Sequence, residues 1–118
     1  MKVLVVDDER FIKEDIIEAL KSDGFEVVGA SNGREALKLL VAQKFDVVIS
    51  DYSMPGLNGL ELLTWVILGD LGDFILMTGI LHNKEKEVCG VHGAKVIEKP
   101  FMFKDLRLLV GASSRSVG

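Results

Sequence analysis

Five short runs of apolar residues, each about as long as a β-strand, recur along the chain. The runs are VLVV (3–6), FEVVGA (25–30), DVVIS (46–50), FILM (74–77) and KVI (95–97). The runs at 3–6, 47–49 and 74–77 show no alternation of polar and apolar residues, which is typical of parallel strands covered on both faces. The sequence therefore predicts buried strands in a parallel sheet.

The segments between the runs carry apolar residues at helical spacing. The apolar positions are Ile12, Ile16, Ala19 and Leu20 in the first segment and Ala36, Leu37, Leu40 and Val41 in the second. Asn32 with Glu35, and Asn58 with Glu61, resemble helix N-caps that have an acid three residues later. A strand and a helix repeated five times predict an α/β domain with helices on both faces of the sheet.

Size, charge and cysteine content narrow the class of protein. A chain of 118 residues suits a single domain. A net charge of −4 and the lack of a Lys/Arg cluster argue against direct nucleic-acid binding. Cys89 is the only cysteine, which excludes an internal disulfide and a cysteine zinc site and favours a cytoplasmic protein.

No apolar run has the length of a signal peptide or a membrane span, so we expect no membrane contact.

Polar residues follow four of the five predicted strands. Asp7 and Asp8 come after the first strand, Asp51 after the third, Thr78 after the fourth and Lys99 after the fifth. Ligands of open α/β sheets bind outside the carboxyl ends of the strands. We therefore expect these five side chains to converge at one edge of the sheet.

Three carboxylates beside one ammonium group indicate a particular chemistry. Carboxylate oxygens suit a hard cation, and Mg²⁺ typically takes one or two of them and leaves other positions to water and phosphate oxygens. Such a site supplies the position and charge that phosphoryl transfer needs, and Asp51 is the best candidate nucleophile. The alternative, acids placed only for a helix dipole, accounts for Glu9 but not for Asp51 and Lys99 at the same edge.

Four motifs in order carry a family resemblance: VVDDE, DYSMPGLNG around Asp51, MTG with Thr78, and KPF with Lys99. With these motifs the chain, over residues 1 to about 110, resembles the receiver domain of two-component response regulators, of the chemotaxis-regulator type. The resemblance implies a flavodoxin-like, doubly wound (βα)5 fold whose five-stranded parallel sheet has the order 2-1-3-4-5.

The resemblance also implies a Mg²⁺ site. Asp8, Asp51 and the backbone carbonyl of Ser53 would ligate the ion, and Asp7 would act through metal-bound water. Mg²⁺ is the only cofactor that the resemblance implies.

For catalysis, the resemblance implies roles for Asp51, Thr78 and Lys99. Asp51 would accept a phosphoryl group from a phosphohistidine on a sensor histidine kinase or phosphotransfer protein. Lys99 would pair with phosphoryl oxygens, in front of a Lys-Pro bond that is usually cis in this family. The Thr78 hydroxyl would bond the phosphoryl group and draw its loop inward. The chain would be a signalling module that catalyses only its own phosphorylation and dephosphorylation, not an enzyme acting on other substrates.

The sequence departs from the family pattern at the switch. Receivers commonly have Tyr or Phe three residues before the lysine, and here that residue is Val96. We expect the nearby Phe101 and Phe103 to pack under the last helix instead. The resemblance also implies that Ser53 and Ile80, two residues after Asp51 and Thr78, tune hydrolysis of the acyl phosphate.

Two other functions remain open. Val96 leaves room for a phosphorylation-independent interaction module on the same fold. A flavodoxin-like cofactor binder is disfavoured because no hydroxyl-rich phosphate loop follows the first strand, and the acids there would repel an FMN phosphate.

The segment LELLTWVIL (60–68) is apolar on nearly every side. Such a helix is either deeply buried or presents a surface to a partner, so Trp65 could serve in a homodimer or another contact.

Residues 111–118, GASSRSVG, are small and polar. We expect them to form a tail or the stub of a linker after a receiver domain of residues 1–110. Because no DNA-binding segment is present, we expect either a stand-alone regulator or the N-terminal receiver of a longer protein.

Overall fold

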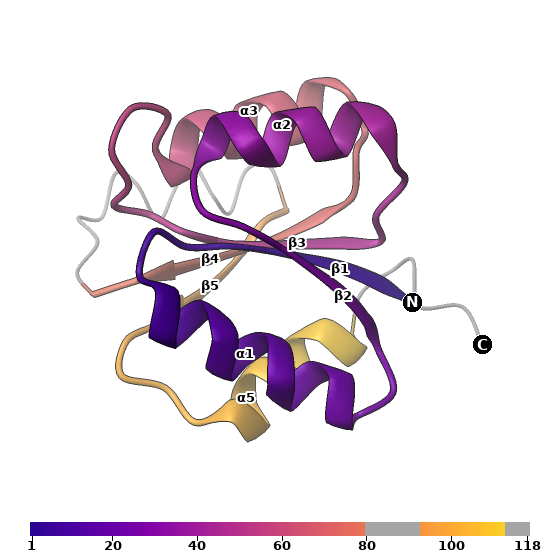
Figure 1. The fold of residues 1–118 in the computed structure, drawn as a ribbon, viewed down its shortest axis with the longest axis vertical. Helices are drawn as coiled ribbons and strands as arrows, with labels where there is room; N and C mark the ends of the chain where they lie inside the picture. Colours follow the sequence, from indigo (N-terminus) through magenta and orange to yellow (C-terminus); the bar gives the residue numbers. More distant parts are fainter. Residues whose placement is uncertain (80–92, 113–118) are drawn as a thin grey trace.

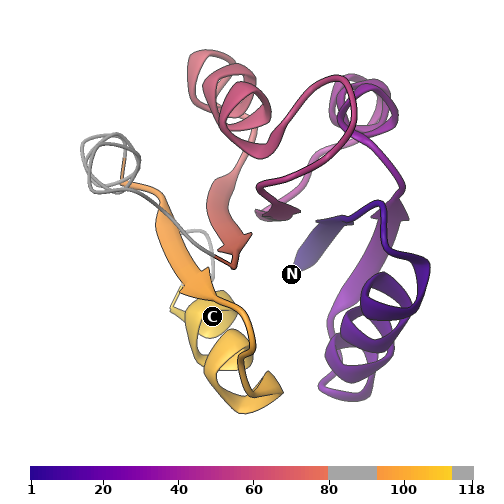
Figure 2. The ribbon, with the colours of Figure 1, turned by 90° about the vertical axis from the view of Figure 1, so that its left-hand side faces the viewer.

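The computed structural model describes residues 1–79 and 93–112, which form a five-stranded parallel sheet covered by helices on both faces (Figures 1 and 2). The strands are β1 (Lys2–Val6), β2 (Glu26–Ala30), β3 (Val47–Asp51), β4 (Asp73–Thr78) and β5 (Lys95–Glu98). The described helices are α1 (Arg10–Ser22), α2 (Gly33–Ala42), α3 (Gly59–Leu68) and α5 (Phe103–Gly111). The sheet order is β2-β1-β3-β4-β5, as predicted. The helix expected between β4 and β5 falls on residues 80–92, outside the described residues.

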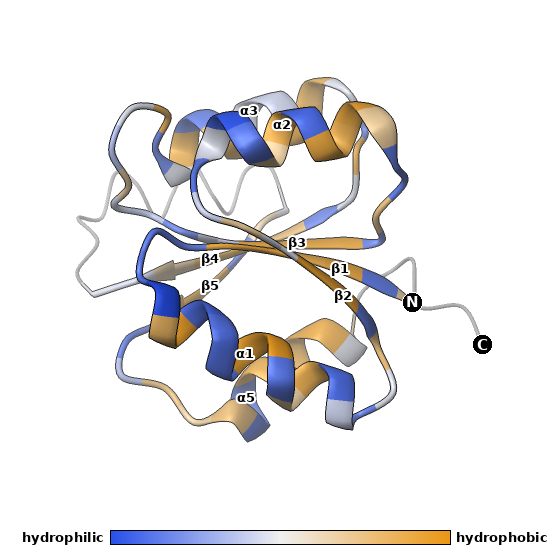
Figure 3. Ribbon diagram, in the orientation of Figure 1, coloured by the Kyte–Doolittle hydropathy of each residue, from blue (hydrophilic) through white to orange (hydrophobic). Residues whose placement is uncertain are grey.

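Two layers of side chains hold the helices on the sheet. Successive residues of a strand point to opposite faces, so Leu4 and Val6 of β1 belong to the cluster with α2 and α3, and Val3 and Val5 to the cluster with α1 and α5. Figure 1 shows these two pairs of helices on opposite faces of the sheet. All four side chains are fully buried. Burial on both faces is the reason that the middle residues of β1, β3 and β4 are apolar, and Figure 3 shows the central strands mainly in the hydrophobic colour.

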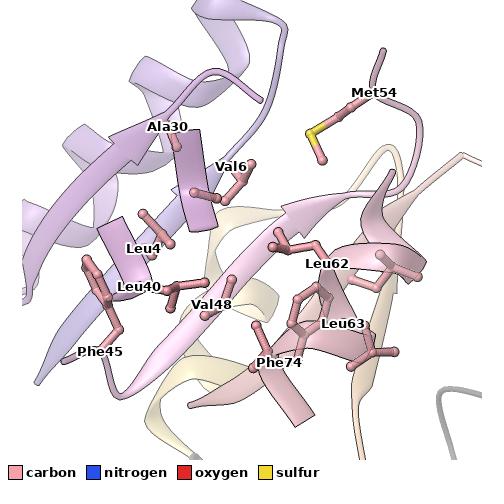
Figure 4. Close-up of a cluster of buried hydrophobic side chains, with 13 residues drawn as sticks. Leu4, Val6, Ala30, Leu40, Phe45, Val48, Met54, Leu62, Leu63 and Phe74 are labelled. Atoms are coloured by element: carbon pink, nitrogen blue, oxygen red, sulfur yellow. The ribbon is translucent and has the colours of Figure 1, made fainter. Parts of the chain in front are cut away.

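Buried hydrophobic side chains fill the space between the sheet and the helices α2 and α3, where they form one cluster (Figure 4). Its buried members are Leu4, Val6, Ala30, Ala36, Leu40, Phe45, Val48, Met54, Leu62, Leu63, Val66, Phe74 and Leu76. Val96, on β5, is partly buried against the same cluster. The second layer joins α1 and α5 to the sheet through residues that include Ile16, Leu20 and Leu106.

Both predicted N-caps are present. The Asn32 side chain accepts a hydrogen bond from the Glu35 backbone N–H at 2.8 Å, at the start of α2. At α3, Asn58 and Glu61 form a reciprocal capping box. Caps of this kind are worth about 1 kcal/mol each.

The apolar pattern of the helices only partly predicts burial. Ala36 and Leu40 of α2 are buried, but Val41 is 85% exposed. On α3, Leu62, Leu63 and Val66 are buried, whereas Trp65 is 55% exposed. Part of α3 therefore presents apolar surface to solvent in the isolated chain, which is one of the two outcomes that its sequence allowed.

The two aromatic residues after Lys99 differ in their packing. Phe101 is partly buried against the layer under α1 and α5. Phe103 begins α5 and is 39% exposed, so only Phe101 packs beneath the helix as expected. Across residues 1–79 and 93–112, no helix combines the length and apolar character that a membrane span requires.

Candidate functional site

The candidate site lies at the carboxyl ends of the strands, on the left of Figure 1. Asp51 and Thr78 are the last residues of β3 and β4, while Asp7 and Lys99 directly follow β1 and β5. Backbone hydrogen bonds continue the ladder past the strand ends: the Asp7 N–H donates to the Ala30 carbonyl at 3.1 Å, and the Lys99 N–H to the Thr78 carbonyl at 2.7 Å. The sheet therefore fixes the backbone at the points where the polar side chains begin.

Three carboxylates meet at this edge, as the sequence predicted. One oxygen each of Asp7, Asp8 and Asp51 can be chosen so that all three lie within 4.8 Å of one another. Asp7 is fully buried and Asp51 is 7% exposed, whereas Asp8 faces solvent. The cluster thus has a buried base and one open side.

Lys99 supplies the cation. Its Nζ lies 3.1 Å from Oδ1 of Asp51 and 3.6 Å from Oδ2 of Asp7. The other oxygen of Asp7, Oδ1, accepts a hydrogen bond from the Glu9 backbone N–H at 2.9 Å. Oδ2 of Asp7 is buried without a hydrogen-bond partner, so its only compensation in the described structure is the nearby ammonium charge.

The charges of the site are imperfectly balanced. Burial raises the pKa of Asp7, and the charges of Asp51 and Asp8 add to the rise, against the lowering effects of the Glu9 N–H and Lys99. Burial likewise raises the pKa of Asp51, with Lys99 opposing it. For Lys99, burial alone would lower the pKa, but the hydrogen bond with Asp51 and the charges of Asp7 and Asp51 raise it overall. The single positive charge of Lys99 therefore does not fully offset the free-energy cost of burying these negatively charged carboxylates close together.

The donor set fits a hard divalent cation. Three carboxylates lie within reach of one ion, one of their buried oxygens lacks a hydrogen-bond partner, and the exposed side leaves room for water or phosphate oxygens. Asp7, Asp8 and Asp51 are the residues that could hold such an ion.

Of the remaining predicted residues, Thr78 and Ser53 lie within the described part of the chain. Thr78 is 2% exposed, and its backbone carbonyl accepts the hydrogen bond from the Lys99 N–H described above. Ser53 is exposed in the loop after β3. The Lys99–Pro100 peptide is cis, as the family resemblance implied. Ile80 lies outside the described residues.

Two residues that the sequence did not single out for the site, Ser50 and Gly59, contact the Asp51 backbone, and a third, Gly33, packs on the loop that follows it. The Ser50 hydroxyl donates a hydrogen bond to the Asp51 carbonyl at 3.0 Å. Gly59 packs so closely that a Cβ there would lie 2.5 Å from the same carbonyl oxygen. Gly33 packs equally closely on Leu57. Both glycines are the first residue of a helix, directly after the predicted N-caps Asn32 and Asn58, which is the only signal that the sequence carries for them.

Comparison with known proteins agrees with this geometry. The family model of the response regulator receiver domain matches residues 3–110. The chemotaxis protein CheY of Listeria monocytogenes is 36% identical over 104 residues, which are 86% of this chain and 87% of that protein. The transcriptional regulatory protein PdtaR of Mycobacterium tuberculosis is 32% identical over 107 residues, 89% of this chain, but the chain spans only about half of that protein, 52%.

Solved structures give the same result. CheY4 of Vibrio cholerae superposes with a TM-score of 0.87 at 31% identity, covering 95% of this chain and 97% of that one. The response regulator TrrA of Thermotoga maritima, solved in complex with Mg²⁺-BeF, has a TM-score of 0.81 at 34% identity and covers 92% and 95% of the two chains. With its fold, its acid cluster and the match over residues 3–110, the chain belongs to the response regulator receiver domain family.

Proposed function

We propose that this receiver domain accepts a phosphoryl group on Asp51 in a Mg²⁺-dependent reaction and signals by a change in conformation. The observation that carries the proposal is the 3.1 Å contact between the Lys99 ammonium and Oδ1 of Asp51 beside two further carboxylates. A carboxylate held beside a lysine ammonium and a candidate Mg²⁺ site can accept a phosphoryl group, because the transferred group brings negative charge that cations stabilise.

Each residue has a role in this proposal. Asp8, Asp51 and the Ser53 carbonyl would hold Mg²⁺, and Asp7 would assist through water. When bound, the ion neutralises phosphoryl oxygens during transfer. Asp51 attacks phosphorus while the bond from phosphorus to the donor atom breaks and the donor leaves with that electron pair. Lys99 and the Thr78 hydroxyl hold the transferred oxygens.

The partner in this proposal is a sensor histidine kinase or a phosphotransfer protein, because receiver domains are signalling modules of two-component systems. TrrA, at 34% identity, supports the metal requirement through its complex with Mg²⁺-BeF. Residues 1–110 would form the receiver unit, and residues 111–118 a tail or linker stub.

Acetyl phosphate tests the chemistry without the kinase. With Mg²⁺, intact mass spectrometry should show one added phosphoryl group on the wild-type chain, with release of acetate. Asp51→Asn should stay unmodified, whereas Asp105→Asn, at an exposed acid of α5, should react like the wild type. Phosphorylation of the Asp51→Asn chain would place the acceptor elsewhere.

The second candidate is a phosphorylation-independent interaction module. Val96 favours it, because a partly buried valine packed on the core is too small and too stiff at χ1 to act as a moving aromatic switch. This candidate predicts that the wild-type chain stays unmodified by acetyl phosphate and Mg²⁺.

A further inference from the structure

The loop of residues 52–58 joins Asp51 to α3 and carries Ser53. Two anchors of the loop are local. The Gly59 N–H donates to the Tyr52 carbonyl at 2.9 Å and so closes the loop at its base. Met54 is 7% exposed and inserts into the cluster under α2 and α3 (Figure 4). The far half of the loop ends at the capping box of Asn58 with Glu61, and Leu57 is partly buried against the same cluster as Met54.

A third anchor comes from another element. Leu57 lies against Gly33, the first residue of α2, where a Cβ would be 2.7 Å from Cβ and Cδ2 of Leu57 and 2.8 Å from its carbonyl oxygen. Gly33 does not have the left-handed backbone that favours glycine, so the lack of space is the reason for glycine here. Because the carbonyl oxygen cannot rotate away as a side chain can, any residue larger than glycine must displace the loop or the helix.

The start of α2 is also tied to the acid cluster. The carboxyl end of β2 is held by the hydrogen bond from the Asp7 N–H to the Ala30 carbonyl, three residues before Gly33. A hollow of about 410 Å³ separates the three segments, and its lining includes Asp8, Asn32 and Leu57. The beginning of α2 therefore lies between the acids that follow β1 and the loop that follows Asp51.

We infer that Gly33 is a positioning residue for Mg²⁺ binding: by letting α2 contact Leu57 directly, it holds the loop that carries Ser53 in the place where it completes the metal site. The inference rests on the proposed function, since it assumes a Mg²⁺ site at Asp8 and Asp51. Mg²⁺ demands near-ideal octahedral geometry, so a loop displaced by a few tenths of an ångström loses affinity even when all ligands remain.

The test is a calorimetric Mg²⁺ titration of the metal-free chain. Gly33→Ala should weaken Mg²⁺ binding about tenfold, as is typical when a residue supporting metal ligands is altered. Gly29→Ala is the matched control. A Cβ at Gly29 is equally close to a neighbour, 2.7 Å, but that neighbour is Cδ1 of Ile17, the movable end of a side chain of α1 far from the loop. Its Mg²⁺ affinity should equal that of the wild type.

Urea unfolding of the same metal-free variants separates positioning from a merely structural role. If Gly33→Ala lowers the free energy of unfolding but leaves Mg²⁺ affinity unchanged, Gly33 only supports the fold and the inference is overturned. Leu57→Ala tests the same contact from the other side without introducing a clash, because it removes the end of the side chain that packs on Gly33. It should also weaken Mg²⁺ binding, by a smaller factor, and unchanged affinity in a folded Leu57→Ala chain would again overturn the inference.

The wild-type titration separates this inference from the function on which it rests. If the wild-type chain itself binds no Mg²⁺, the proposed function fails. If the wild type binds Mg²⁺ and both variants bind it equally well, only the role of Gly33 fails.

Discussion

The Lys99 ammonium lies 3.1 Å from Oδ1 of Asp51, although β4 separates the strands that carry the two residues. The lysine follows β5 and the aspartate ends β3, so the side chain of Lys99 spans the end of the intervening strand. Thr78, the last residue of β4, lies at that end. The contact therefore links β5 to β3 across the end of β4, and the same ammonium also lies beside the buried carboxylate of Asp7.

Lys99→Met should destabilise the metal-free chain most strongly at neutral pH. Lys99 opposes the rise in the pKa of Asp7 and Asp51, so without it both pKa values should rise further. A carboxyl whose folded-state pKa is raised costs no stability below its unfolded pKa, and the cost grows as pH rises toward the folded-state pKa. We expect a loss of about 1–3 kcal/mol at neutral pH, the usual cost of an uncompensated buried polar group. Urea unfolding should show a smaller loss at about pH 4.

Lys104→Met, at an exposed lysine of α5, is the control for this prediction. It should change the free energy of unfolding little at either pH. A pH-independent effect of Lys99→Met would mean that the lysine stabilises the fold through packing rather than charge.

Asp7→Asn should stabilise the chain in the absence of metal. Asp7 is fully buried, one of its oxygens lacks a hydrogen-bond partner, and its pKa is raised by burial. Asparagine keeps the oxygen that accepts from Glu9 and removes the charge, for a gain on the order of 1 kcal/mol at neutral pH. Because the cost in the wild type appears only above the unfolded pKa, the gain should shrink in acid. Chemical denaturation at both pH values measures it, and a destabilised variant would contradict this account.

Mg²⁺ should raise the melting temperature of the wild-type chain. An ion that binds only the folded state stabilises it by about 2.7 kcal/mol at a concentration one hundred times its dissociation constant. Asp8 is exposed, so Asp8→Asn should leave the metal-free stability within about 0.5 kcal/mol of the wild type while removing most of the Mg²⁺ effect. Calorimetric melts with Mg²⁺ and with chelator compare the two chains. An equal Mg²⁺ shift in both would exclude Asp8 as a ligand.

Two alanine substitutions in α3 should separate its buried side from its exposed side. Leu62 is fully buried, so Leu62→Ala should cost about 2–5 kcal/mol. Trp65 is 55% exposed, so Trp65→Ala should cost clearly less than the about 3–5 kcal/mol typical of a buried aromatic residue. Urea unfolding measures both. Sedimentation of the same variants tests the prediction that Trp65 takes part in self-association, which Trp65→Ala should then weaken.

The sheet and the site edge could be predicted because both depend on simple patterns. A strand buried on both faces must be apolar throughout, so the runs at β1, β3 and β4 were unambiguous. Parallel strands place all their carboxyl ends at one edge, so Asp7, Asp51 and Lys99 had to converge once the strands were located. The caps at Asn32 and Asn58 could be predicted because each joins residues only three positions apart in the sequence.

Features that depend on contacts between distant segments could not be predicted. Consecutive acids gave no sign that Asp7 would be fully buried and Asp8 exposed, because that division depends on the path of the chain after β1. Helical spacing grouped Val41 with Leu40 as core residues, but α2 lies on the sheet in a position that buries Leu40 and leaves the Val41 side chain exposed to solvent. The packing of Gly33 on Leu57 joins the start of α2 to the loop after β3, two segments that are far apart in the sequence.

The order in which the chain is synthesised gives the sheet topology a further consequence. Asp7 and Asp8 follow β1 and Asp51 ends β3, whereas Lys99 follows β5, so a ribosome releases the carboxylates well before the cation that offsets them. A nascent chain that lacks β5 would have to assemble three mutually repelling carboxylates with no ammonium among them. We therefore expect the burial of Asp7 and Asp51 to cost more free energy until the last strand joins the sheet and brings the Lys99 ammonium beside them.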